Sequence, residues 1–228
     1  MAEPTSRHDS GSIFVLAGCN GAGKSSIGGA ALRQAGAPFF DPDEAARQIA
    51  ARYAGPIGAD VQREINGAAW QQGLRLLRRT IARRGTFAFE TTLGGHTIPV
   101  AVAEAAAAGL AVHIWFVGLN RVELNIERVR RRAARGGHDI PIAKIRERYV
   151  NAPANLVRLL PEIAELKLFD NSIDADPAAG RAPSPRLLMH CRDRRIVVPG
   201  ALQMLVTATP AWAKPIVAAA LKLHLRQR

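Results

Sequence analysis

The segment from residue 18 to residue 25 has the composition of a phosphate-binding loop. It reads GCNGAGKS and matches the pattern G-x-x-x-x-G-K-[ST] at every fixed position. Glycines let backbone N–H groups fold around phosphate oxygens without a clash from a Cβ atom, and the helix expected after the loop adds partial positive charge. In such loops the lysine reaches the β- and γ-phosphates, and the hydroxyl that follows it ligates Mg²⁺. The loop therefore predicts that ATP binds to Gly18, Asn20, Gly21, Ala22, Gly23, Lys24, Ser25 and Ser26, with Ser25 as the Mg²⁺ ligand.

Carboxylates follow two predicted strands, at the point where each strand ends. Asp41 and Asp43 come after the run PFF, and Glu90 ends the run TFAFE. Ligands of open α/β sheets bind outside the carboxyl ends of the strands. A carboxylate there can accept the proton of an attacking hydroxyl group or hold that hydroxyl in line. Because aspartate at a helix N-terminus also caps the helix, capping is sufficient to explain Asp41, and Asp43 is the candidate catalytic base.

The residues after Glu90 supply further groups for an acceptor molecule. Thr91 and Thr92 carry hydroxyls, and the glycine pair at 94–95 permits a close approach of the backbone to a ligand. An ordinary strand-to-helix turn would have a similar composition. We expect Glu90, Thr91 and Thr92 to bind the acceptor together with Asp43.

Arginine recurs along residues 121–135, a predicted helix that ends at the glycine pair 136–137. A charge run of this kind is usually a solvated helix face. Here it precedes a flexible pair of glycines, as expected for a lid whose arginines neutralise charge during phosphoryl transfer. Positions seven apart share a helix face, so Arg128 and Arg135 are predicted to be catalytic and the arginines between them to lie on the surface. His138 is interpreted as an incidental loop residue.

Strands alternate with helices along most of the chain, which is typical of a parallel sheet covered by helices on both faces. The expected strands cover residues 12–17, 38–41, 86–90, 110–117 and 165–169. The expected helices run from the phosphate-binding loop to about residue 34 and then over 42–51, 60–84, 97–108, 121–135 and 141–160. The predicted fold is therefore an α/β P-loop NTPase with a basic helical lid.

The predicted P-loop domain covers residues 12–172, after a flexible polar tail at 1–11. A linker rich in proline, alanine and glycine follows at 174–185. Residues 173–228 are expected to form an extension that packs on the domain, with two short strands and a basic amphipathic helix near 211–225. Such a helix can touch a membrane surface, but packing against a core is the more common arrangement.

Composition limits the class of protein. Hydrophobic residues make up 48% of 228 residues, enough for a sizeable core. The formal net charge of +12 favours polyanionic partners, namely nucleic acid, an anionic membrane or a phosphorylated ligand. Aromatic residues make up only 5% and are not interleaved with the basic ones, so a base-stacking surface is not expected.

The sequence predicts a cytoplasmic protein. Its two cysteines form neither a disulfide framework nor a metal-ligand pattern. Residues 1–11 contain no apolar signal core. The apolar stretch 98–119 contains Glu104 and His113 and is divided by a glycine, so it is interpreted as a helix followed by a buried strand rather than as a membrane span.

The ordered series of motifs resembles the zeta-toxin family of P-loop kinases. The resemblance implies an ATP-dependent kinase that phosphorylates the 3′-hydroxyl of UDP-N-acetylglucosamine, and it implies a small antitoxin protein as a possible partner. It covers residues 12–172 and is carried by the phosphate-binding loop, DPDEAAR (41–47), FAFETTLGG (87–95), IERVRRRAARGGHDIP (126–141), IRERYVNAPANL (145–156) and LFDNS (168–172).

Carried over to this sequence, the resemblance makes Lys24 the phosphate lysine and Asp43 the base. It matches Glu90 and Thr92 to substrate contacts and Arg128 to a phosphate contact. The sequence departs from the family pattern at two positions. A family glutamate aligns near Leu74 or Arg75, and the second lid arginine aligns near His138, so that Arg135 would take its role.

The sequence therefore predicts an ATP-dependent kinase whose acceptor is a hydroxyl of a small molecule, with a nucleotide sugar as the expected acceptor. A nucleic-acid-associated P-loop ATPase or a polynucleotide kinase is the alternative indicated by the net charge and the arginine-rich helix. A third possibility is a toxin–antitoxin component whose role depends on its protein partner.

Overall fold

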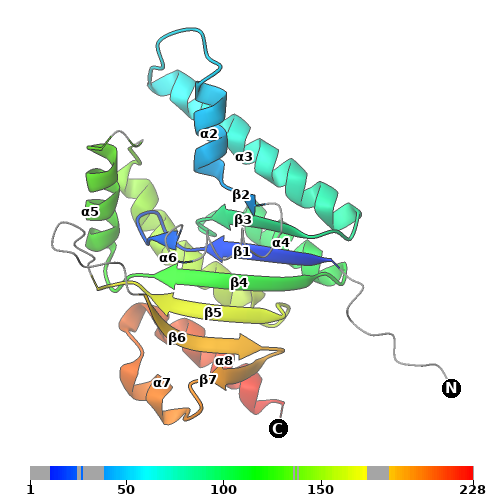
Figure 1. Ribbon diagram of the computed structural model, residues 1–228. Helices are drawn as coiled ribbons and strands as arrows, with labels where there is room; N and C mark the ends of the chain where they lie inside the picture. Colours follow the sequence, from blue (N-terminus) through cyan, green and yellow to red (C-terminus); the bar gives the residue numbers. More distant parts are fainter. Residues whose placement is uncertain are drawn as a thin grey trace.

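The apolar run at residues 12–17 forms an inner strand of a seven-stranded sheet. The computed structural model describes residues 11–24, 27, 39–135, 137, 139–173 and 185–227. Its strands lie in the order β2-β3-β1-β4-β5-β6-β7 (Figure 1). They are β1 (Ser12–Ala17), β2 (Phe39–Phe40), β3 (Phe87–Thr91), β4 (Ala111–Gly118), β5 (Glu165–Asp170), β6 (Arg186–Arg192) and β7 (Arg195–Val198).

Helices connect these strands and follow the last one. Most of the helix predicted between the phosphate-binding loop and residue 34 lies outside the described residues. A short 3₁₀ helix at Ala211–Ala213 precedes the last helix. The α-helices are α2 (Pro42–Ala50), α3 (Ala59–Ala82), α4 (Thr97–Ala107), α5 (Val122–Ala133), α6 (Ile142–Leu159), α7 (Gln203–Ala208) and α8 (Lys214–Leu225).

The strands from β1 to β5 are parallel. Strand β1 pairs with β3 and β4, β2 pairs with β3, and β5 pairs with β4. The predicted parallel α/β sheet is therefore confirmed. Since parallel strands end at the same edge of a sheet, the loop after β1 and the carboxylates that follow β2 and end β3 lie at one edge, and α5 stands at the same edge (Figure 1).

The chain after residue 184 continues the same sheet. Strand β6 is antiparallel to β5, with Met189 opposite Leu168, and β7 is antiparallel to β6. Helix α8 packs against α6 and β7. The ring of Trp212 lies so close to the end of β4 that a Cβ atom at Gly118 would be 2.3 Å from it. The C-terminal part thus shares a hydrophobic core with the P-loop part.

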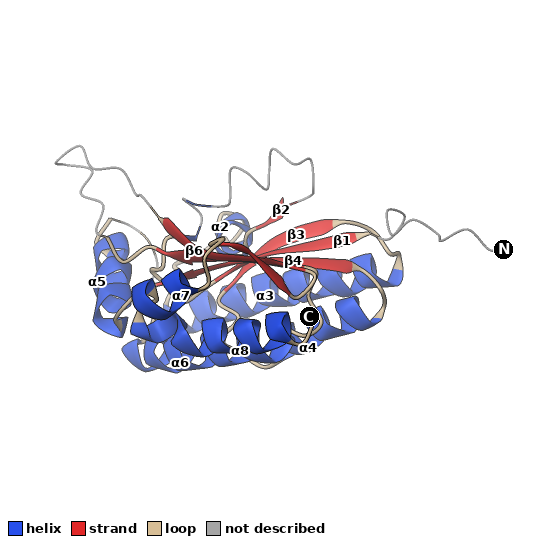
Figure 2. Ribbon diagram, turned by 90° about the horizontal axis from the view of Figure 1, so that it is seen from below, coloured by secondary structure: helices blue, strands red, loops and turns tan. Residues whose placement is uncertain are grey.

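One face of the sheet is covered by α4, α6 and α8 (Figure 2). The side chains that point to these helices, such as Val15, Ile114 and Leu166, are fully buried or nearly so. They alternate along each strand with partly exposed residues of the opposite face, as the pleat of a strand requires. This core is the rigid support of the loops at the carboxyl edge.

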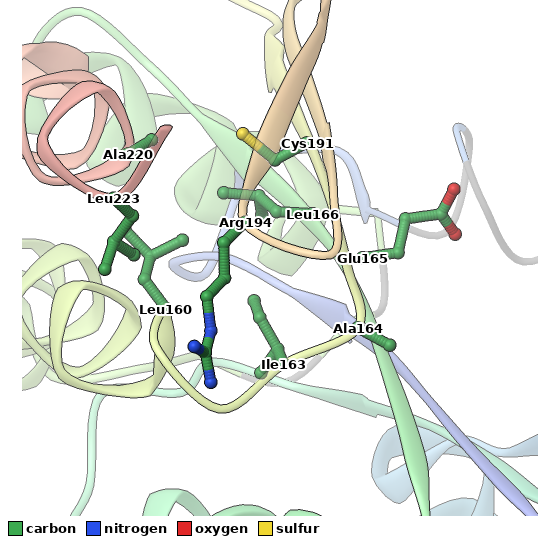
Figure 3. A pocket seen from close by; sticks show the side chains of 9 residues that line it. All are labelled: Leu160, Ile163, Ala164, Glu165, Leu166, Cys191, Arg194, Ala220 and Leu223. Atoms are coloured by element: carbon green, nitrogen blue, oxygen red, sulfur yellow. The ribbon is translucent and has the colours of Figure 1, made fainter. Parts of the chain in front are cut away.

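The packing of the C-terminal part leaves a small cavity between α6, β5, the β6–β7 hairpin and α8 (Figure 3). Its volume of about 10 Å³ is about that needed to hold one water molecule, which is too small for a ligand. Cys191 lines it, and burial raises the pKa of the Cys191 thiol to about 12. The thiol is therefore protonated at neutral pH and packs as a small hydrophobic group.

A buried carboxylate joins three strands on the opposite face of the sheet. Glu165 of β5 contacts His113 Nδ1 of β4 at 3.1 Å, and His190 Nε2 and Arg192 of β6 at 2.7 and 3.2 Å. Burial alone would raise the pKa of Glu165, but the hydrogen bonds from His190, His113 and Arg192 outweigh it and hold the pKa at about 2. The charged form of Glu165 is therefore part of the folded structure.

Replacing Glu165 with glutamine should lower the free energy of unfolding by about 1–3 kcal/mol at pH 7. The contribution of the carboxylate is complete above its unfolded pKa of 4.5 and disappears as the pH falls towards 2. Urea unfolding of both proteins at pH 7 and pH 3 would measure this. Glu104→Gln, at an exposed position of α4, is the control. An equal difference between wild type and Glu165→Gln at both pH values would contradict the explanation.

Candidate functional site

The loop after β1 has a backbone that only glycine adopts without strain. Gly18, Gly21 and Gly23 have φ angles of 138°, 76° and 85°, in the region disfavoured for other residues. Packing adds a second reason at the first two positions, because a Cβ atom would lie 2.1 Å from the carbonyl oxygen of Val117 at Gly18 and 2.5 Å from that of Asn125 at Gly21. The sequence pattern of a phosphate-binding loop therefore corresponds to a backbone held against β4 and α5.

Side chains from three other elements hold the carbonyl groups and the asparagine of this loop. The Nδ2 group of Asn125 on α5 donates to the Asn20 carbonyl at 2.7 Å, and that of Asn171 after β5 donates to the Ala22 carbonyl at 2.9 Å. Arg148 of α6 donates to the Asn20 side-chain oxygen at 2.8 Å. These bonds use acceptors of the loop, which suits a loop whose N–H groups are to face an anion.

Lys24 is buried at the end of the loop, with 7% of its surface exposed. Its ammonium group donates to the Cys19 carbonyl oxygen at 3.3 Å and lies 3.4 Å from Glu90 Oε1 at the end of β3. The structure thus brings together the predicted phosphate lysine and the predicted acceptor-binding glutamate. Ser25 and Ser26, the next predicted ligands of the nucleotide and metal, lie outside the described residues.

A cleft of about 560 Å³ opens beside this loop, at the carboxyl edge of the sheet. The loop and Lys24 form one wall, and the N-terminus of α2 and one side of α3 form another. The residues of the turn after β3 and the first part of α6 close the remaining sides. Its charged lining residues are Lys24, Asp41, Asp43, Glu90, Arg132, Asp139, Lys144, Glu147 and Arg148.

The two aspartates after β2 have different roles in the structure. Asp41 caps α2, as predicted, because its Oδ1 accepts hydrogen bonds from the backbone N–H groups of Asp43 at 2.9 Å and Glu44 at 3.4 Å. Burial raises the pKa of Asp41, and the charge of Glu90 raises it further. Asp43 is not used as a cap. Its side chain is about half exposed and its Oδ2 lies 3.2 Å from Arg132 of α5, so this carboxylate bridges the two sides of the cleft.

The turn after β3 is held in one conformation by its own hydroxyls and by α6. Thr91 and Thr92 accept hydrogen bonds from the N–H groups two residues further on, at 3.1 and 3.4 Å. Leu93 has a positive φ of 56°, which is strained for leucine. Asn155 of α6 offsets this by donating to the carbonyls of Leu93 at 2.6 Å and Gly95 at 2.8 Å. Both threonine hydroxyls keep a hydrogen to donate, at the edge of the cleft.

No protein-family model matches the chain. An uncharacterized protein of Haemophilus influenzae (strain ATCC 51907 / DSM 11121 / KW20 / Rd) is 32% identical over 132 residues, which are 58% of this chain and 88% of that protein. The chain belongs to the same family as this Haemophilus influenzae protein.

Solved structures identify the fold. The complex AvrRxo1-ORF1:AvrRxo1-ORF2 with sulphate ions has a TM-score of 0.61 at 17% identity, over 94% of this chain and 76% of that chain. The same complex with ATP has a TM-score of 0.60 at 16% identity, over 89% and 64%. A structure of the PezAT chromosomal toxin–antitoxin system of Streptococcus pneumoniae has a TM-score of 0.50 at 14% identity, over 78% and 72%. The zeta-toxin-like P-loop kinase fold predicted from the sequence is confirmed.

Within this fold, the arginine of α5 that reaches the cleft is Arg132. The sequence interpretation placed Arg132 on the surface and chose Arg128 and Arg135 instead. Arg128 donates to the backbone carbonyls of Asn171 at 3.0 Å and Ile173 at 3.4 Å, and neither Arg128 nor the exposed Arg135 is among the described residues that line the cleft. The sequence interpretation relied on a spacing of seven positions. Positions four apart also share a helix face, and among these arginines it is Arg132 that contacts Asp43 of α2.

Arg148 is a cleft residue that the sequence interpretation did not single out. Beyond its bond to Asn20, it packs so closely on the turn after β3 that a Cβ atom at Gly94 would lie 2.7 Å from its side chain. The sequence could have pointed to Arg148 by its spacing of seven positions from Asn155, which places both residues on one face of α6. His138, interpreted as incidental, lies outside the described residues.

Two features are absent from the part of the chain that the structure describes. No helix there combines the length and the hydrophobicity needed to cross a membrane. No group of three or more histidine, cysteine, aspartate or glutamate side chains is placed there to hold a metal ion. The predicted Mg²⁺ ligand is instead the hydroxyl of Ser25, which would act together with the phosphates of the nucleotide.

Proposed function

We propose that this protein is an ATP-dependent kinase that transfers the γ-phosphate to a hydroxyl of a small molecule, with UDP-N-acetylglucosamine or a related nucleotide sugar as the acceptor. One observation carries the proposal. A single cleft holds Lys24 of the phosphate-binding loop on one side and the carboxylate of Asp43, which contacts Arg132, on another. Phosphoryl transfer needs this pair of features, a phosphate site and a group that accepts the proton of the attacking hydroxyl.

The loop is suited to bind a nucleoside triphosphate. The atoms around Gly18 and Gly21 leave no room for a side chain at either position. Hydrogen bonds from Asn125 and Asn171 already use carbonyl groups of the loop. The N–H groups of the loop and the Lys24 ammonium are then the donors that would bind phosphate oxygens. When bound, Mg²⁺ would neutralise charge on the β- and γ-phosphates, with Ser25 as the expected protein ligand.

In the proposed reaction the acceptor oxygen attacks the γ-phosphorus, and the bond from that phosphorus to the β–γ bridging oxygen breaks. Asp43 takes the proton of the acceptor hydroxyl, and ADP leaves with the electron pair of the broken bond. Lys24 and Arg148 supply positive charge beside the loop, and Arg132 supplies it beside Asp43. Glu90, Thr91 and Thr92 hold the acceptor on the side of the cleft formed by β3.

The test is product analysis of purified protein with ATP, Mg²⁺ and UDP-N-acetylglucosamine. We expect mass spectrometry to detect the nucleotide sugar with one added phosphoryl group, and ATP consumption to require the acceptor. If ATP binds but this sugar is not phosphorylated, the assignment of the acceptor is wrong and the kinase assignment remains open to other acceptors. If ATP does not bind, the kinase assignment itself fails.

The same reactions should include a single-stranded oligonucleotide, because the net charge of the chain is +12. The cleft lining does not concentrate that charge, since carboxylates stand beside the cations among the described residues that form it. Tight oligonucleotide binding with a steep dependence on salt, together with phosphorylation of its 5′ end, would favour a polynucleotide kinase instead.

A protein partner is the remaining part of the proposal. The AvrRxo1-ORF1 structures contain AvrRxo1-ORF2, and PezAT is a toxin–antitoxin system. We therefore propose a small antitoxin-like protein as a partner of this chain. Co-purification of such a protein from the native host, and inhibition of the kinase by it, would be the supporting result.

A further inference from the structure

The part of the cleft lining that comes from α3 has a chemical character unlike that of the rest. It is formed by a stripe of α3, defined here as Asn66, Gly67, Trp70, Gly73 and Leu74. These positions recur with the period of a helix and therefore share one face. None of them is ionisable, whereas the phosphate-binding loop, the start of α2 and α6 all bring charged groups to the cleft.

Nothing in the described part of the structure requires glycine at position 67. Glycine in the interior of a helix is destabilising relative to alanine. At Gly73 this has an explanation, because a Cβ atom there would lie 2.5 Å from the ring of Phe40. At Gly67 a Cβ atom would meet no atom of the described residues within 4 Å, and the backbone does not have a positive φ. The missing side chain leaves open space in the cleft beside Trp70.

Trp70 is a large aromatic side chain with 38% of its surface exposed. It lies one helical turn after Asn66, whose Oδ1 accepts a hydrogen bond from Gln62 at 3.0 Å. That bond uses the oxygen of the Asn66 amide, so its N–H₂ group is the donor that this side of the cleft offers to a ligand. An indole face, an open floor and an amide donor together suit a flat, uncharged ring that carries hydrogen-bond acceptors.

We propose that the α3 stripe is the subsite for a flat heteroaromatic ring of the acceptor, with Trp70 as the stacking surface and Gly67 as the open floor. The proposal rests on the kinase function proposed above and specifies its acceptor: a molecule with a hydroxyl that reaches Asp43 and an uncharged ring that reaches α3. A phosphate group of the acceptor does not bind at this stripe, because the stripe carries no cation.

Ring binding can be measured without catalysis. The protein is saturated with ADP to occupy the nucleotide site, and tryptophan fluorescence is followed as uridine, adenosine or N-acetylglucosamine is added. We expect a nucleoside to quench the fluorescence, the sugar without a flat ring to have no such effect, and Trp70→Ala to abolish the quenching. Trp115→Phe is the matched control, because Trp115 packs against Phe169 and Lys167 on the sheet, away from the cleft.

A second variant, Gly67→Leu, tests the subsite without destabilising the helix. Leucine has the higher helix propensity, so this variant should be at least as stable as the wild type while its side chain fills the floor. We expect nucleoside binding and the acceptor KM to worsen by about tenfold or more in Gly67→Leu and Trp70→Ala, with the KM for ATP unchanged and with Trp70→Phe close to wild type.

Two outcomes overturn the subsite. One is the absence of any nucleoside binding to the ADP-saturated wild type, and the other is binding that Trp70→Ala and Gly67→Leu leave unchanged. The proposed function fails separately. If nucleosides bind with the expected dependence on Trp70 and Gly67 but no acceptor is phosphorylated, the subsite stands and the kinase assignment does not.

Discussion

Replacing Lys24 with methionine is expected to lower kcat by about 10²–10³-fold, because the variant loses a positioned positive charge that stabilises the transferring phosphate. Methionine retains most of the length of the buried side chain, which is 7% exposed in the wild type. Initial rates of ATP-dependent phosphorylation at saturating acceptor would measure the loss. Retention of activity within about tenfold of wild type would mean that the loop does not form the phosphate site.

A loss of activity must be separated from a loss of stability. Lys24 lies 3.4 Å from Glu90, which is only 14% exposed, and removing one partner of a buried ion pair destabilises a protein. The double variant Lys24→Met/Glu90→Gln removes both charges. It should unfold at a higher denaturant concentration than Lys24→Met alone, and its activity should remain low. If the double variant regained activity with stability, Lys24 would be structural.

The central part of the fold follows from local patterns in the sequence. Strand β1 has the predicted bounds, because an apolar run ends at a glycine loop, and β3 to β5 start and end within one or two residues of their predicted positions. The phosphate-binding loop is equally local, since three positive φ angles in six residues are a direct consequence of its glycines. The cap formed by Asp41 was also predictable, because capping depends only on the residues that follow it.

Other features depend on pairings that no local pattern encodes. The last strands, β6 and β7, continue the sheet through β5. Glu165 becomes the junction of three strands only because the registers of β4 and β6 against β5 place His113 and His190 beside it. Their types and spacing along the chain give no sign of this contact.

The arginines of α5 show the same limit within the site. Helical periodicity places Arg128 and Arg132 on roughly one face, but only the position of α5 relative to α2 and β5 decides which group each one meets. Arg128 donates to the carbonyl groups of the segment after β5 and so holds α5 against it. Arg132 instead reaches the cleft and contacts Asp43. Arg128 thus joins α5 to the segment after β5, with both hydrogen bonds donated by its Nη2 group.

The second large effect is expected for Asp43→Asn, which should lower kcat by about 10²–10⁴-fold, the contribution of a positioned general base. Asparagine keeps a side-chain oxygen that can accept the hydrogen bond from Arg132, now 3.2 Å from Asp43, so the shape of the cleft is retained while the proton acceptor is lost. The KM for ATP should change little, since Asp43 lies on the acceptor side. Single-turnover rates over a range of pH would measure the loss and the disappearance of the basic group from the profile.

The neighbouring aspartate offers a matched control for this variant. Asp41→Asn also removes one carboxylate from the cleft, but asparagine caps a helix as well as aspartate does, so α2 should remain in place and the rate should stay near that of wild type. Arg132→Gln removes the group that holds Asp43 and should have an intermediate effect, because the base remains but its position is less restricted. Equal losses in Asp41→Asn and Asp43→Asn would show that the cleft needs negative charge in general and would remove the reason to assign the proton transfer to Asp43.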